Sequence, residues 1–277
     1  MIEPDAGVVY LFGPLTVLSA MFMSMASSAI WSRNVGETSC GWRVSYSPDG
    51  RAFGIWGLIY AYTFGSVVAQ CTGLVVVLEW WTNFLWALAW VGCAFWVPLF
   101  DAEYKRALLS AAIVISLAAG CALGGVWHAQ LWNADTAEQR LRQLAIGAPL
   151  ILLAGWLFTA TSIGWGITFK AYEPGAYATC VPVPPKRQDE TQQQYRYRRR
   201  VLYRESYTKA PVVISLVPLM LAIVLGGLAV AIPAPGLTTP LLWAVLNLRG
   251  FPSVVYVASV VVALCGSALG VLRIFVW

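Results

Sequence analysis

The sequence has few charged residues. Asp, Glu, Lys and Arg make up 11% of its 277 residues, whereas 59% are hydrophobic, and a soluble domain carries about 25% charged residues. This composition excludes an ordinary soluble domain and indicates several membrane-spanning helices. Apart from Arg273, near the end of the last apolar run, no charged side chain lies within a run. That absence argues against an ion pump, an ion-coupled transporter or an intramembrane enzyme.

The sequence also lacks the usual metal-binding and catalytic patterns. Its six cysteines show no CxxC or other metal spacing, and they imply no disulfide framework. The single histidine is His128, beside Trp127 at an expected helix end. Such a histidine can be an axial ligand of a porphyrin iron, or it can simply lie at the headgroup level. We therefore predict a protein that is not an enzyme and requires no metal, with His128 as the one candidate ligand.

A targeting peptide is not evident either, since Glu3 and Asp5 stand where a signal or transit peptide would carry positive charge. We expect either a mature chain or a first span that serves as its own targeting signal.

The apolar runs predict an all-α, polytopic transmembrane bundle of about eight spans. A helix needs about 20 residues, at 1.5 Å per residue, to cross the bilayer core. The expected spans are 8–31, 53–78, 84–100, 107–127, 144–168, 211–232, 238–248 and 253–276. The 238–248 segment is short, and either crosses with a tilt or is re-entrant. We divide the chain into a five-span unit (1–170), a basic extramembrane segment (171–210) and a C-terminal extension of two to three spans (211–277).

The positive charges are distributed unevenly about these spans. With eight crossings, 15 of the 18 Lys and Arg residues fall in loops on one side, which the positive-inside rule assigns to the cytoplasm or the matrix. We expect an integral protein of the mitochondrial inner membrane, with loops 32–53 and 170–210 in the matrix. The alternative is a bacterial-type plasma membrane with these loops in the cytoplasm.

Within the basic segment, residues 186–209 interleave arginines with tyrosines. The arginines singled out are Arg196, Arg198, Arg199, Arg200 and Arg204. They can act as a plain topology determinant, or as a docking surface for anionic lipids or a partner protein, since a basic residue near such a membrane contributes about 1 kcal/mol. Basic residues with aromatics can also bind RNA, but on a membrane surface we expect no nucleic acid.

Two GxxxG motifs lie in apolar runs. They consist of Gly120 with Gly124, and of Gly266 with Gly270. Small residues four apart allow two helix backbones to approach closely, so these glycines predict helix-packing faces. The alternative is a chance glycine pair in a glycine-rich membrane helix.

Three ordered motifs resemble the tryptophan-rich sensory protein branch of the translocator protein (TspO) family. The first is the family's F-x-I/V-W-x-x-L/I-Y signature, filled by Phe53, Ile55, Trp56, Ile59 and Tyr60. Trp96 and Phe100 match its third helix, and Pro149, Gly155, Trp156 and Ala160 match its fifth. The resemblance covers about residues 8–170 and implies a translocator-type fold. It also implies a cavity for a tetrapyrrole, sterol or lipid, with Trp56, Tyr60, Trp96, Phe100 and Trp156 as candidate lining residues.

The chain departs from the family pattern at two polar positions. Cys93 and Gly164 stand where the family places asparagines, and loop 32–53 lacks its Trp-x-Pro-Pro motif. Because an intramembrane Asn orients a ligand or a neighbouring helix, these losses suggest that the polar part of the cavity has decayed.

Three functions follow as hypotheses. The first is a non-catalytic accessory subunit of a larger membrane complex, such as a respiratory-chain assembly. The second is a translocator-like protein that binds a hydrophobic ligand. The third, an enzyme acting on that ligand, is the least favoured because no acid/base pair is visible.

Overall fold

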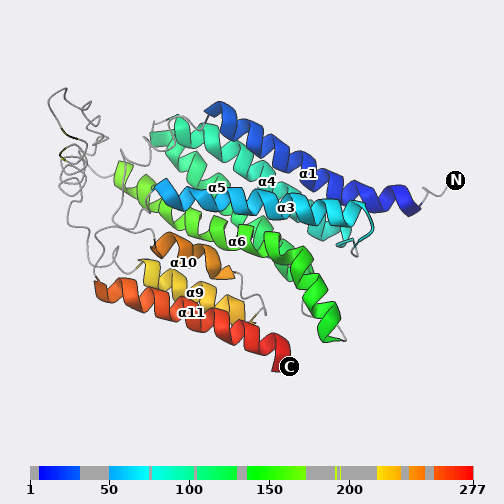
Figure 1. Cartoon of the computed structure of the whole chain (residues 1–277). Coiled ribbons are helices and arrows are strands. Elements are labelled where there is room, and N and C mark those ends of the chain that lie inside the picture. Colours follow the sequence, from blue (N-terminus) through cyan, green and yellow to red (C-terminus); the bar gives the residue numbers. More distant parts are fainter. Residues whose placement is uncertain are drawn as a thin grey trace.

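The structure, a computed structural model, describes residues 6–31, 50–74, 77–102, 105–129, 136–172, 191, 194, 217–231, 237–246 and 253–276. Over these residues it contains eight α-helices and no strand, which confirms the prediction of an all-α membrane bundle. Figure 1 shows the long helices lying side by side, with successive helices running in opposite directions.

The elements, in chain order, are α1 (Ala6–Trp31), the 3-10 turn η1 (Gly50–Gly54), α3 (Ile55–Cys71), α4 (Trp80–Asp101), α5 (Lys105–Ala129), α6 (Ala137–Tyr172), α9 (Val217–Ala231), α10 (Thr239–Leu246) and α11 (Ser253–Val276). Five described segments are long and apolar enough to cross a membrane: Leu11–Trp31, Ala52–Cys71, Trp80–Asp101, Lys105–Ala129 and Ile146–Tyr172. The chain is therefore an integral membrane protein.

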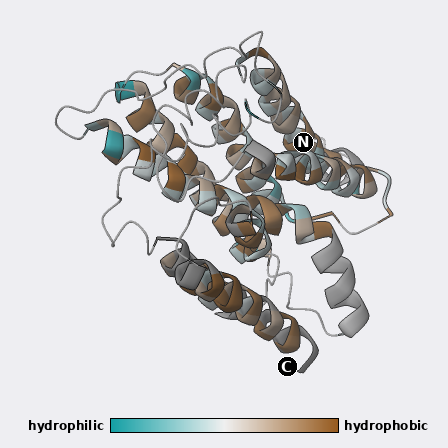
Figure 2. Ribbon diagram, turned by 60° about the vertical axis from the view of Figure 1, so that its left-hand side comes forward, coloured by the Kyte–Doolittle hydropathy of each residue, from teal (hydrophilic) through white to brown (hydrophobic). Residues whose placement is uncertain are grey.

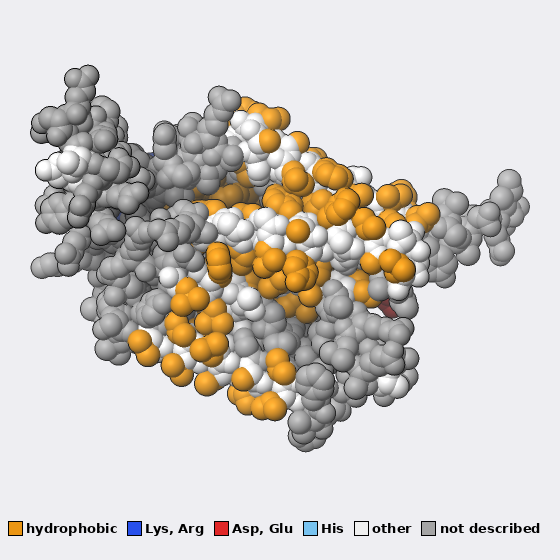
Figure 3. All heavy atoms as spheres, in the orientation of Figure 1, with side chains coloured by type: hydrophobic (Ala, Val, Ile, Leu, Met, Phe, Trp, Pro, Cys, Tyr) orange, Lys and Arg blue, Asp and Glu red, His pale blue; other side chains and the backbone are white. Residues whose placement is uncertain are grey.

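The helices form two packed groups. In the larger group α4 packs between α1 and α5, α6 packs on α5, and α3 joins α1 to α6 (Figure 1). In the smaller group α9 and α11 pack side by side and run in the same direction, and α10 lies between this pair and α6. Hydrophobic residues dominate the helices in Figure 2 and are spread over the outer surface in Figure 3, as expected of helices that face lipid.

The α3 helix ends earlier than the sequence suggests, since the predicted span continues to Leu78. Gly73 has φ +71°, in the left-handed region, and the Leu74 N–H donates to the carbonyl of Ala69 at 3.0 Å. This glycine-based C-cap stops the helix at Cys71 despite the apolar residues that follow. The expected span 53–78 was therefore wrong at its C-terminal end.

Two buried amide side chains fix the connection from α3 to α4. Gln70 accepts a hydrogen bond from the Leu78 N–H at 3.0 Å, and Asn83 donates to the Leu78 carbonyl at 2.8 Å. Both polar groups of the Leu78 backbone are thus paired by side chains. The two helices run in opposite directions, as the short connection predicts, but α3 packs mainly on α1 and α6 rather than on α4.

The length of α10 shows whether the 238–248 segment crosses the membrane. Its eight residues rise about 12 Å, whereas the bilayer core is about 30 Å thick. It therefore does not cross the membrane as a helix, and it packs instead against α6 and α11.

The helix directions agree with the grouping of loops that the charge asymmetry uses. α1, α4 and α6 end, and α3, α5, α9 and α11 begin, at the same end of the bundle, on the left in Figure 1. Lys105, Arg106 and Lys170 lie at this end. Which compartment it faces stays a prediction.

Candidate functional site

Five aromatic side chains join three helices and the 3-10 turn of the larger group. We call them the aromatic row: Phe53 of η1, Trp56 and Tyr60 of α3, Trp90 of α4 and Trp156 of α6. The Tyr60 ring stacks on Trp90 at 4.9 Å between centroids and 21° between planes. The ring centroid of Trp56 lies 6.1 Å from those of both Trp90 and Trp156, and the rings of Phe53 and Trp156 meet edge to face with centroids 6.2 Å apart. The row therefore continues unbroken from α4 to α6 through α3.

The row is deeply buried at Trp90 and Trp156 and more open at Trp56 and Tyr60. Trp90 is fully buried and Trp156 is 2% exposed, whereas Trp56 and Tyr60 are half-buried. The hydroxyl oxygens of Tyr60 and Ser24, on α1, are 3.1 Å apart and share a hydrogen bond. The Tyr60 side chain is thus held by α1 as well as by its ring contacts with Trp56 and Trp90.

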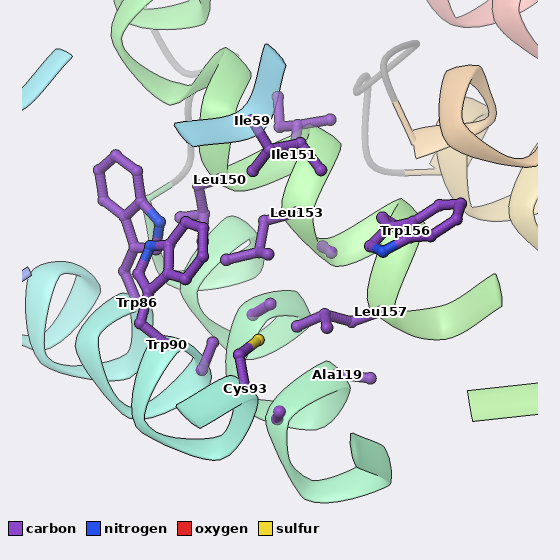
Figure 4. Close-up of a cluster of buried hydrophobic side chains, with 14 of the residues drawn as sticks. Ile59, Trp86, Trp90, Cys93, Ala119, Leu150, Ile151, Leu153, Trp156 and Leu157 are labelled. Atoms are coloured by element: carbon purple, nitrogen blue, oxygen red, sulfur yellow. The ribbon is translucent and has the colours of Figure 1, made fainter. Parts of the chain in front are cut away.

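Several tryptophans of this region carry a buried indole N–H group that donates no hydrogen bond to any described residue. The Nε1 atoms of Trp86, Trp90 and Trp156 have no hydrogen-bond acceptor among the residues that the structure describes. Leaving a buried donor unpaired costs about 1–3 kcal/mol. Figure 4 shows Trp86 and Trp90 lying close together on α4, while Trp156 points away from them on α6. Two helices of the row, α4 and α6, thus each contribute a buried donor without an acceptor in the described part of the chain.

A family comparison agrees with this arrangement. A model of the TSPO-like protein family matches residues 11–175, more than half of the chain. The chain belongs to this family. No curated protein and no solved structure matches it.

The family match confirms the resemblance inferred from the three motifs. It ends in the segment after α6, so α9, α10 and α11 lie outside it. In the signature at the start of α3, Ile55 and Ile59 are buried in the core, while Trp56 and Tyr60 belong to the row. The spacing of the TSPO-like signature thus serves both core packing and the aromatic row.

The structure brings together three of the five residues proposed for the cavity, namely Trp56, Tyr60 and Trp156. Trp96 and Phe100 instead stack on each other at 4.9 Å, farther along α4. The member that sequence reasoning missed on α4 is Trp90. Trp90 lies one turn before Cys93 on the same helical face, and this spacing could have identified it as a site residue.

The two positions that lack the family's asparagines are buried. Cys93 is 2% exposed and belongs to the main core. Gly164 is buried against α5, where an added Cβ would lie 3.9 Å from the Cα of Ala112 and 3.8 Å from Ile115. Small side chains here allow α4, α5 and α6 to approach.

His128 lies near the end of α5, at the opposite end of the bundle from Trp56. Its Nδ1 is 3.3 Å from the Thr82 hydroxyl and 3.5 Å from a Glu79 carboxylate oxygen, and its side chain is 39% exposed. Among the described residues, no group of three or more His, Cys, Asp or Glu could hold a metal ion. The geometry thus places His128 far from the aromatic row.

The GxxxG glycines have different surroundings. A Cβ on Gly266 would lie 2.5 Å from the Cα of Gly226, so α11 and α9 are in backbone contact there. Gly124 meets only a Leu85 side chain at 3.6 Å, and Gly120 faces open space. Gly270 lies in α11, without a described side-chain environment. The close α4–α5 approach uses Gly92 instead, opposite Ala118.

The basic docking residues cannot be placed. Arg196, Arg198, Arg199, Arg200 and Arg204 all lie outside the residues that the structure describes.

Proposed function

We propose that this TSPO-like membrane protein binds a flat hydrophobic molecule with a hydrogen-bond acceptor, of the tetrapyrrole, sterol or lipid class, at the aromatic row. The observation that carries the proposal is the set of buried, acceptor-free indole N–H groups of Trp90 and Trp156 on either side of Trp56. The described residues show no acid/base pair beside the row, so we propose binding without catalysis.

The chemistry of the row fits such a ligand. Aromatic faces contact flat apolar molecules well, and an indole N–H is a donor only. Carboxylate, ester and hydroxyl oxygens all accept hydrogen bonds, so each of the three ligand classes offers a partner. The half-buried rings of Trp56 and Tyr60 are the part of the row that a ligand reaches first.

The proposal predicts a specific effect of removing the donors. Trp90→Phe and Trp156→Phe keep an aromatic ring but delete the N–H. Each is expected to raise the dissociation constant by about threefold to tenfold, because one hydrogen bond contributes about 0.5–1.5 kcal/mol. The measurement is a titration of the full-length protein, in lipid nanodiscs, with protoporphyrin IX followed by porphyrin absorbance.

Trp81→Phe is the matched control, because the Trp81 side chain is 55% exposed near the start of α4, away from the row. Affinities that are equal in all three variants and the unmodified protein would refute the role of the buried donors. An absence of binding by the unmodified protein to protoporphyrin IX, to cholesterol and to phospholipid vesicles alike would refute the function itself.

A second candidate function, the accessory subunit of a larger membrane complex, is favoured by a different observation. Cys93 and Gly164, which replace the family's polar residues, are packed in the core, as expected for a scaffold whose cavity has decayed. The basic 186–209 segment would then dock to partner subunits or anionic lipids. Native gel electrophoresis of the mildly solubilised protein tests this. Comigration with a fixed set of larger membrane subunits is expected, and migration as an isolated monomer or dimer would contradict it.

A further inference from the structure

The C-terminal extension is in contact with the candidate site. The Trp243 Nε1 of α10 donates a hydrogen bond to the Ala52 carbonyl of η1 at 2.9 Å, across 191 positions of sequence. Ala52 immediately precedes Phe53, the end of the aromatic row. The extension that lies outside the family match is thus tied to the start of the family signature.

A second contact fixes the other end of α10. The backbone carbonyl of Leu237 lies so close to Gly155 that any Cβ at this position would collide with it. Gly155 is the neighbour of Trp156 and was singled out by the family motif. Its lack of a side chain is what allows the extension to lie directly on α6.

Burial shows that α10 covers apolar surface between these two contacts. Leu237 and Ala244 are almost fully buried and belong to the same core cluster as Trp156. Leu241 is buried against the smaller helix group. The segment therefore covers the flank of the molecule where Phe53 and Trp156 meet.

We propose that α10 is a cap that closes the Phe53–Trp156 end of the aromatic row and opens to admit the ligand from the surrounding lipid. This inference rests on the proposed ligand-binding function. An eight-residue helix has little stability of its own, so its position depends on its contacts. The Trp243 hydrogen bond links α10 to η1.

Two variants loosen the cap by independent means. Trp243→Phe deletes the hydrogen bond and keeps a ring, whereas Gly155→Ala introduces a Cβ where the Leu237 backbone now lies. Gly120→Ala is the matched control, since it adds the same methyl group to a membrane helix in open space.

The test combines two measurements on the full-length protein in lipid nanodiscs. Hydrogen exchange, read by mass spectrometry, reports the opening of residues 237–246, and rapid mixing with protoporphyrin IX reports the association rate. Both loosened variants are expected to exchange faster in this segment. They are also expected to bind about threefold to tenfold faster, the factor that corresponds to one hydrogen bond. Gly120→Ala should behave as the unmodified protein.

The remaining outcomes separate the cap from the site. Faster exchange with an unchanged association rate would make α10 a fixed wall, and would overturn the cap while leaving the proposed function intact. Unchanged exchange in both variants would show that these contacts do not hold α10, and would also overturn it. If neither the unmodified protein nor any variant binds protoporphyrin IX, cholesterol or lipid, the proposed function fails and the cap fails with it.

Discussion

Replacing Trp90 by alanine is expected to lower the free energy of unfolding by about 3–5 kcal/mol, the usual cost of removing a large buried aromatic side chain. Trp90 is fully buried and stacks on Tyr60. In a membrane protein the cost comes mainly from lost packing, because lipid tails solvate an apolar ring as well as the core does. Titration with a denaturing detergent, followed by circular dichroism, measures the change.

The control for this prediction is Trp81→Ala, on the same helix. The Trp81 side chain is 55% exposed, so the expected loss is below about 1 kcal/mol. Equal losses at the two positions would contradict the central place that the structure gives to Trp90. The unpaired Trp90 N–H makes the expected loss smaller than that of a fully hydrogen-bonded tryptophan.

Replacing Gly266 by alanine is expected to cost about 1–3 kcal/mol, as overpacking of a tight contact does. The new Cβ would lie 2.5 Å from the Gly226 Cα and 3.3 Å from its carbonyl carbon and oxygen. These are backbone atoms, so no rotamer change can relieve the clash and α9 must move away from α11. Gly266→Leu is expected to separate the two helices altogether.

Gly227→Ala provides a close comparison for Gly266→Ala. It lies next to Gly226 on α9, but an added Cβ there meets nothing within 4 Å. The expected change is therefore within about 0.5 kcal/mol of zero. The same detergent titration applies to both, and a Gly266→Ala protein as stable as Gly227→Ala would refute the backbone contact.

The two GxxxG motifs show what the pattern can and cannot predict. The spacing identifies a face of small residues, but it does not say which neighbour that face meets. Gly266 meets another glycine, Gly226, whereas Gly120 faces open space. The close α4–α5 approach depends on Gly92 and Ala118, and no sequence spacing links these two residues of different helices.

The sequence predicted the residues of the candidate site that lie close together along one helix or within a family motif. Trp56 and Tyr60 share one helical face because they are four residues apart, and the family motif added Trp156. Trp90 was missed because choosing between it and Trp96 requires the rotation of α4 about its axis, which many aromatic positions leave undetermined. The sequence could not predict the hydrogen bond from Trp243 to Ala52, because this bond depends on where the short helix α10 packs against the bundle.

Apolar length predicted several helix boundaries closely, but α6, at Ala137–Tyr172, extends beyond the expected 144–168, and α3 ends at a local cap. The final span was placed at residues 253–276, as observed for α11. In α3, by contrast, the glycine cap at Gly73 ended the helix inside an apolar run. Hydropathy does not detect such a cap, since it depends on one backbone angle.

The bond from Trp243 to Ala52 also sets an order of events during biosynthesis. A ribosome adds about 5–20 residues per second, so the 191 positions between the two residues take about 10–40 s to translate at that rate. During this interval the nascent chain holds η1, and in its later part also α6, without the segment that later covers them. The contacts at Ala52 and Gly155 can therefore form only after α10 has been synthesised.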